Sequence, residues 1–169
     1  MSTPRFIALV ALSLTFVAFG LYLSSPNSDG LSLRDSIHEA LIYAAVLDTV
    51  APRGQTIILV AVTDSNSFGE RRAVTHLIPS RNPLRFVSET DVTVPDADLE
   101  RYWRNFYARF PGSSGWYTMS DIEYNAAHRE AMVWVRHHCG GLCGSWDLVK
   151  LSKTNGSWHI TRFDVIMVS

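Results

Sequence analysis

An uncharged apolar run near the N-terminus, from Phe6 to Leu23, constrains this chain more than any other feature. A helix of this length spans about 27 Å, which is close to the thickness of the hydrocarbon layer of a bilayer. All of its backbone hydrogen bonds close within the helix, so it leaves no orphaned polar group in lipid. We therefore predict that residues 1–23 form a signal-anchor or transmembrane helix and that the chain meets a membrane through residues 6–23.

Two alternatives to an uncleaved anchor stay open. Small residues at Ala18 and Gly20 offer a signal-peptide cleavage site, which would release a secreted protein. A helix buried in a soluble core is the third reading, and the lack of any charge disfavours it. Arg5 precedes the run and Asp29 follows it, which favours an orientation with the C-terminal part outside the cytoplasm. We expect that part in the periplasm or at the cell exterior.

The remaining residues are enough for one domain. Residues 24–31 are polar and contain Pro26 and Gly30, as is typical of a linker, and residues 32–169 then form a single domain. The formal net charge of the 169 residues is -1, and acidic and basic side chains are interspersed. This charge pattern, with no nucleic-acid motif, excludes a DNA- or RNA-binding class.

Two helices are predicted in the first two thirds of that domain. Ser32 begins the first, which ends near Val50 before Pro52, with one apolar face. The second runs from Asp96 or Asp98 to Arg109, and residues 111–115 stop it. The expected apolar face of the first helix is Leu33, Ile37, Leu41, Ala44 and Ala45, and that of the second is Leu99, Trp103, Phe106 and Phe110.

Strands account for most of the rest. A buried strand is predicted at residues 55–63, a weaker strand or short helix at 70–77 and a brief strand at 84–87. Four more follow at 116–124, 130–138, 145–152 and 157–168, joined by short connections that indicate an antiparallel meander. Asn155-Gly156 marks a tight hairpin turn. The sequence thus predicts an α+β domain in which two helices cover one face of an antiparallel sheet, and an NTF2-like cone is one arrangement that fits.

The most distinctive local motif is Cys139-Gly-Gly-Leu-Cys143, between two predicted strands. Two thiols this close oxidise outside the cytoplasm, so we predict a disulfide that fixes the shape of the loop. A metal site that adds His137 and His138 is the alternative, but it lacks a CxxC pair, and neighbouring residues of a strand point to opposite faces. A redox role lacks a CxxC at a helix N-terminus. We expect no metal and no cofactor.

A candidate binding surface lies on the strands beside that loop. Trp134 and Trp146 are expected to pack as a cross-strand aromatic pair, or, if exposed, to form a binding surface together with His138. Catalytic residues stay unknown, because no GxSxG elbow frames a serine and His38-Glu39 lacks the second histidine of HExxH.

Four stretches of the last 70 residues or so form a shared pattern: the helix end at 106–115, the strand Ala131-Met-Val-Trp-Val135, the loop Cys139–Gly144, and the hairpin with Leu151, Lys153, Gly156 and Trp158. Together they resemble a family of uncharacterised bacterial exported proteins with PGSSG, CGGLCG and NGxW-like motifs. The chain departs from that pattern at residues 121–124 and at Ser145-Trp146. The resemblance implies a domain type and bacterial export, and it implies no reaction.

The sequence is consistent with three functions. The first is a non-enzymatic, membrane-anchored module that binds a protein partner or a small ligand or serves in the cell envelope. The second is a small hydrolase-like enzyme with a pocket between sheet and helices, which His138 or Asp147 would line. The third is an immunity or inhibitor protein whose disulfide loop inserts into a target.

Overall fold

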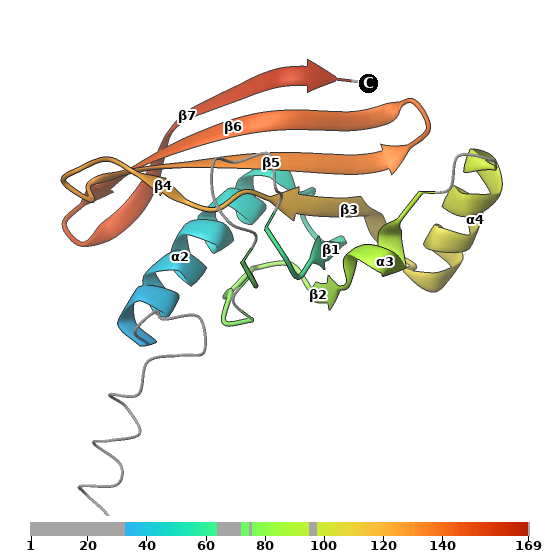
Figure 1. Ribbon diagram of the computed structural model, residues 1–169, viewed down its shortest axis with the longest axis horizontal. Coiled ribbons are helices and arrows are strands. Elements are labelled where there is room, and N and C mark those ends of the chain that lie inside the picture. Colours follow the sequence, from blue (N-terminus) through green and yellow to red (C-terminus); the bar gives the residue numbers. More distant parts are fainter. Residues whose placement is uncertain (1–32, 64–71, 75, 95–97, 169) are drawn as a thin grey trace, which may run out of the picture. The chain divides into compact units, whose positions relative to one another are not determined.

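The computed structural model describes residues 33–63, 72–74, 76–94 and 98–168 (Figure 1). The predicted segment 1–23 and linker 24–31 lie outside these residues, so their boundaries stay predictions. The chain divides after Ile37 into two units, and the fold given below is that of the second unit, residues 38–169, with the preceding residues of α2. Within the described residues, no helix combines the length and the apolar character that crossing a membrane requires.

The described chain contains three helices and seven strands. The helices are α2 (Leu33–Val50), α3 (Glu89–Val92) and α4 (Leu99–Arg109). The strands are β1 (Thr56–Val60), β2 (Leu84–Val87), β3 (Ser113–Met119), β4 (Glu123–Tyr124), β5 (Glu130–Gly140), β6 (Cys143–Thr154) and β7 (Ser157–Val168).

All seven strands belong to one sheet, in the order β2-β1-β3-β5-β6-β7, with β4 paired to β5. The α+β class predicted from the sequence is confirmed, but the prediction of an antiparallel sheet is wrong at one end. The meander from β3 to β7 is antiparallel, whereas β1 pairs in parallel with both β2 and β3. Parallel pairing requires a long crossover, which the chain supplies through residues 61–83 and through α3 and α4.

The two long helices cover opposite faces of the sheet, not one face as predicted. Successive side chains of a strand alternate between faces, so Ile57 and Leu59 pack into a core with α2 while Ile58 and Val60 pack into a second core with α4. We call these the α2 face and the α4 face. The α2 face continues along the meander through residues Tyr117, Met119, Val133, Val135, Val149 and Leu151.

The stripe predicted for α4 is largely confirmed, because Trp103, Phe106 and Phe110 are buried while Leu99 is exposed. The face predicted for α2 is confirmed at Ala44 and Ala45, which contribute to the core, and is wrong at Ile37 and Leu41, which are exposed. The helix buries a face rotated away from those two residues, consisting of Ala40, Ile42, Tyr43, Ala44, Val46 and Leu47.

Local boundaries differ from the predictions at three places. The stop expected at 111–115 is shorter, because β3 already begins at Ser113, and the strand expected at 116–124 is split into β3 and β4. In the segment 70–77 the described residues contribute one isolated bridge, from Ala73 to Val62. Helix α3 was not predicted. The Asn155-Gly156 turn is confirmed, with both residues at positive φ.

Candidate functional site

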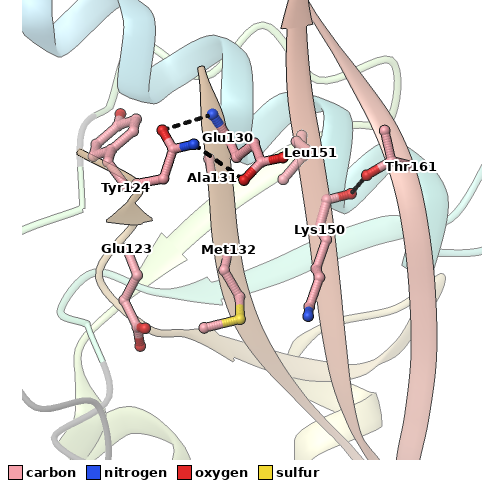
Figure 2. Close-up of a pocket in the computed structure, with 9 residues that line it drawn as sticks. Glu123, Tyr124, Glu130, Ala131, Met132, Lys150, Leu151 and Thr161 are labelled. Atoms are coloured by element: carbon pink, nitrogen blue, oxygen red, sulfur yellow. Dashed lines mark hydrogen bonds between the residues drawn. The ribbon is translucent and has the colours of Figure 1, made fainter. Parts of the chain in front are cut away.

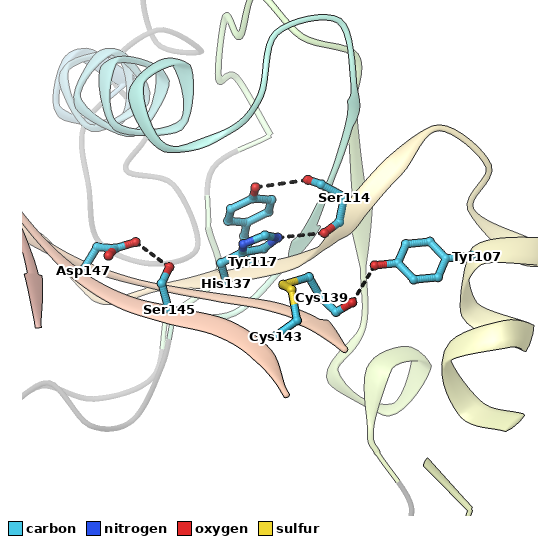
Figure 3. Close-up of a disulfide and its surroundings, with 8 residues drawn as sticks. All are labelled: Tyr107, Ser114, Tyr117, His137, Cys139, Cys143, Ser145 and Asp147. Atoms are coloured by element: carbon cyan, nitrogen blue, oxygen red, sulfur yellow. Dashed lines mark hydrogen bonds between the residues drawn. A yellow bond between two sulfur atoms is a disulfide. The ribbon is translucent and has the colours of Figure 1, made fainter. Parts of the chain in front are cut away.

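The disulfide turn closes the β5–β6 hairpin. Cys139 and Cys143, the predicted pair, are joined in a disulfide with a Cα–Cα distance of 5.0 Å. The hydroxyl of Tyr107 on α4 donates a 2.7 Å hydrogen bond to the carbonyl oxygen of Cys139 (Figure 3). Closing so short a loop stabilises the fold by about 2 kcal/mol on the loop-entropy scale. The turn is thus tied to α4, while Leu142 at its tip is 92% exposed.

A polar cluster lies beside the turn on the α2 face. The ring of His137 stacks on Tyr117 at 4.3 Å, and its Nε2 donates to the carbonyl oxygen of Ser114 at 2.8 Å. The Ser145 hydroxyl donates to Oδ2 of Asp147 at 2.8 Å (Figure 3). The other carboxylate oxygen of Asp147 is buried and has no hydrogen-bond partner among the described residues.

The hydrogen bonds of this cluster favour a structural role over nucleophilic catalysis. A serine nucleophile needs a base that accepts its proton, but the Ser145 hydroxyl bonds to Asp147 and His137 bonds to a backbone carbonyl, so the histidine is not placed as that base. Burial raises the pKa of Tyr117, which holds that phenol neutral. Asp147 and His138, both predicted to line one pocket, lie on opposite faces of the sheet.

Burial also makes His137 a source of pH-dependent stability. Desolvation lowers the pKa of His137, and the Ser114 hydrogen bond and the Asp147 charge oppose that shift only in part. The folded-state pKa is therefore below the unfolded value of about 6.5, so protonation favours the unfolded chain. We expect the free energy of unfolding to fall as the pH is lowered through 6.5 in the wild type.

The variant His137→Gln keeps a hydrogen-bond donor and cannot titrate, so it should show a shallower fall. Urea unfolding at intervals between about pH 7.5 and 5.5 measures both slopes, and parallel slopes would contradict the assignment.

The predicted binding residues come together on the α4 face. Trp134 and His138 are on β5 and Trp146 is on β6, and the strand register gives all three the same orientation. The rings of Trp134 and Trp146 are 5.2 Å apart, and the His138 ring stacks on Trp116 at 3.9 Å. All three predicted residues are half-buried. Their role as a binding surface stays a prediction, but the structure does bring them together.

Arg136 is the site residue that sequence reasoning missed. It lies between Trp134 and His138 on the same face of β5, and its guanidinium is 4.8 Å from the centre of the Trp146 ring. The register places it directly opposite Thr118 on one side and Trp146 on the other, and Trp146 is opposite Met167. The sequence did contain a signal for Arg136: it is two residues from Trp134 and two from His138, and residues two apart in a strand share a face.

Two pockets flank this row of residues and share Arg136 and His138. One, of about 300 Å³, is bounded by Gly144, Trp146 and Met167. The other, of about 340 Å³, has apolar side chains from β1 and α3 and from the residues that follow each of them, namely Val60, Val62, Val92 and Val94, and polar side chains from Glu89, Thr93 and Thr118. Arg136 and His138 line both pockets, and we call the two pockets together the cross-strand groove.

A further pocket of about 370 Å³ lies toward the other end of the meander. Figure 2 shows Glu123, Met132 and Lys150 pointing to the same side of the sheet, as their direct pairing across β4, β5 and β6 requires. Asn125 is bonded to Glu130 at its rim. Its polar groups do not converge on one point, so we assign it no chemistry.

No group of three or more His, Cys, Asp or Glu side chains in the described chain is placed to hold a metal ion. The two cysteine sulfurs are bonded to each other, and His137 and His138 point to opposite faces, so the four residues of the metal alternative do not converge. Comparisons with protein-family models, with curated proteins and with solved structures find no match to this chain.

Proposed function

We propose that this protein is a membrane-anchored, extracytoplasmic module that binds an extended segment of a partner protein in the cross-strand groove. The observation that carries the proposal is the row of Thr118, Arg136, Trp146 and Met167 across four strands, with a pocket on either side of Arg136 that is lined by both apolar and polar side chains.

The compartment is inferred from two independent features. The apolar run at residues 6–23 favours export or anchoring, and the Cys139–Cys143 disulfide persists in oxidising compartments and is rare in a reducing cytosol. The resemblance to bacterial exported proteins supports the same location.

The shape and chemistry of the groove favour an extended chain over a compact metabolite. Neighbouring strands are about 4.8 Å apart, so the path from Trp146 on β6 to Thr118 on β3 is about 10 Å, the length of roughly three extended residues. Side chains of an extended segment alternate, so two of them can enter the two pockets while Arg136 lies beneath the backbone between them. Tryptophan and arginine are also the side chains most enriched at binding hot spots.

Two alternatives remain predictions. A small hydrolase-like enzyme with a pocket between sheet and helices would need a nucleophile and a base in that pocket, and the hydrogen bonds of the polar cluster do not join Ser145 to His137. An inhibitor-type protein would use the tip of the disulfide turn, which the exposure of Leu142 allows.

The groove is tested by selecting random peptides displayed on phage against the full chain in detergent micelles. We expect selected peptides to carry two apolar side chains separated by one residue, and to bind Trp146→Leu and Arg136→Gln at least tenfold more weakly than the wild type, because both changes alter the groove. Isothermal titration with a synthetic peptide measures the affinities.

Leu142→Ser is the matched control, since it removes an exposed apolar side chain outside the groove. Peptides that lose affinity for Leu142→Ser and keep it for Trp146→Leu would favour the inhibitor alternative. Failure of the selection to enrich any peptide would count against a peptide groove.

A further inference from the structure

Strand β7 forms one edge of the sheet and is unusually apolar for an edge. No described strand pairs with its outer side, so a row of backbone N–H and C=O groups faces outward there. Soluble proteins protect such edges because they pair readily with other strands. Residues Phe163, Val165, Ile166, Met167 and Val168 of this strand are between 41% and 73% exposed.

The exposed side chains lie on both faces of the sheet. Phe163 and Val165 are opposite Val149 and Asp147 and therefore extend the α2 face, whereas Met167 is opposite Trp146 on the α4 face. The apolar row of the α2 core thus continues to the last strand without a described element to cover it. A partner that adds a strand to β7 would bury these side chains as well as pair the backbone.

The positions of the charged residues in β7 favour a second copy of the same strand as the partner of this edge. Arg162 and Asp164 flank Phe163 and are the only charged residues between His159 and the end of the strand. The two side chains form an ion pair with each other within the chain. Antiparallel pairing about a two-fold axis at Phe163 also places each Arg162 opposite Asp164 of the other copy, which adds two opposite-charge pairs between the chains. An axis at Asp164 would oppose two carboxylates, and an axis at Val165 would leave both charges opposite apolar residues.

The irregularities of β7 fit a short ladder at this place. Its register against β6 shifts at Thr161 and again at Ile166, and such shifts normally limit edge pairing. The regular stretch between them is Arg162 to Val165, which contains the three residues that the two-fold pairing at Phe163 needs. Phe163 would then meet its own copy on the α2 face, next to Val149 of each chain.

We propose that the protein forms a symmetric homodimer in which the β7 strands of two copies pair antiparallel about Phe163. The two sheets become one continuous sheet, and the partner is a second copy of this chain. This interface is centred on Phe163 of the α2 face, on the same strand as Met167 of the groove, and the proposal does not depend on what the groove binds.

Cysteine cross-linking tests the axis. Opposed residues at a two-fold axis have Cβ atoms about 5 Å apart, so Phe163→Cys in the full chain in detergent micelles should give a covalent dimer under mild oxidation. His159→Cys is the matched control on the same strand, because its two copies would be about 27 Å apart. The native cysteines are already joined to each other and do not interfere.

Charge reversal gives a second test that does not depend on cross-linking. Arg162→Asp alone and Asp164→Arg alone should each weaken the dimer by tenfold or more, because each puts like charges opposite each other. An equimolar mixture of the two variants should restore a heterodimer to within about threefold of the wild-type dissociation constant, measured by sedimentation velocity. An effect confined within one chain could not be rescued by mixing.

A monomeric wild type, equal cross-linking at positions 163 and 159, or no rescue on mixing would overturn the proposal. Cross-linking of Phe163→Cys to a different protein would overturn it as well, since β7 would then accept a foreign strand.

Discussion

Replacing Gly115 by alanine is expected to destabilise the fold by about 4 kcal/mol, which is a large part of the stability of an ordinary domain. Gly115 lies in β3 with φ at +118°, a conformation that side-chain-bearing residues rarely adopt. A Cβ there would overlap the carbonyl oxygen of His138 and lie 2.8 Å from the Cα of Cys139. Backbone strain and steric overlap each cost about 1–3 kcal/mol, and here both occur against the backbone of a central strand.

Gly112→Ala is the matched control in the same segment. Gly112 also has a positive φ, +75°, but a Cβ there meets nothing within 4 Å. We expect a cost of about 1 kcal/mol from the conformation alone. Urea unfolding followed by tryptophan fluorescence measures both variants, and equal losses would show that the close approach of β3 to β5 is not what requires glycine.

The sequence pattern identified Gly115 but assigned it to the wrong element. Residues 111–115 contain Pro and Gly, which are typical of a helix stop, and the local pattern cannot tell a turn glycine from a strand glycine that faces a neighbouring backbone. That neighbour, His138–Cys139, lies more than 20 residues away along the chain. Long-range contacts of this kind leave no trace in the local sequence.

The parallel pairing of β1 with its two neighbours could not be predicted for the same reason. The meander from β3 to β7 has short connections, which impose antiparallel neighbours, and it was predicted correctly. β1 and β2 are separated by a long connection that contains no clear periodicity, so nothing local states that β1 joins the sheet in parallel with β2 and β3.

Three residues of the candidate site could be predicted from the sequence, but the pockets around them could not. Trp134, His138 and Trp146 stood out by residue type, and the alternation of β5 placed the first two on one face. The pockets that flank Arg136 depend on α3 and on β1, whose positions over the sheet follow from tertiary packing. Met167 enters the groove only because β7 pairs with β6 in one particular register.

Helix α2 shows how a uniformly apolar segment hides its buried face. Residues 41–47 read Leu-Ile-Tyr-Ala-Ala-Val-Leu, so every direction around the helix is apolar in its middle turns. Without a polar face for contrast, the 3.6-residue period does not choose between rotations. Packing against the sheet determines the rotation instead. It buries Tyr43 and Leu47 and leaves Leu41 46% exposed. The hydroxyl of the buried Tyr43 donates a hydrogen bond to the carbonyl oxygen of Ser120.

Leu47→Ala is therefore expected to cost about 3 kcal/mol, while Leu41→Ala on the same helix should change the free energy of unfolding by less than about 0.5 kcal/mol. Leu47 is fully buried in the core between α2 and the sheet, so its truncation leaves a cavity. Both substitutions have the same helix-propensity change, so the difference between them isolates burial. Urea unfolding of the two variants measures that difference directly. Equal losses, or a larger loss for Leu41→Ala, would mean that α2 packs through the face that the sequence pattern first suggested.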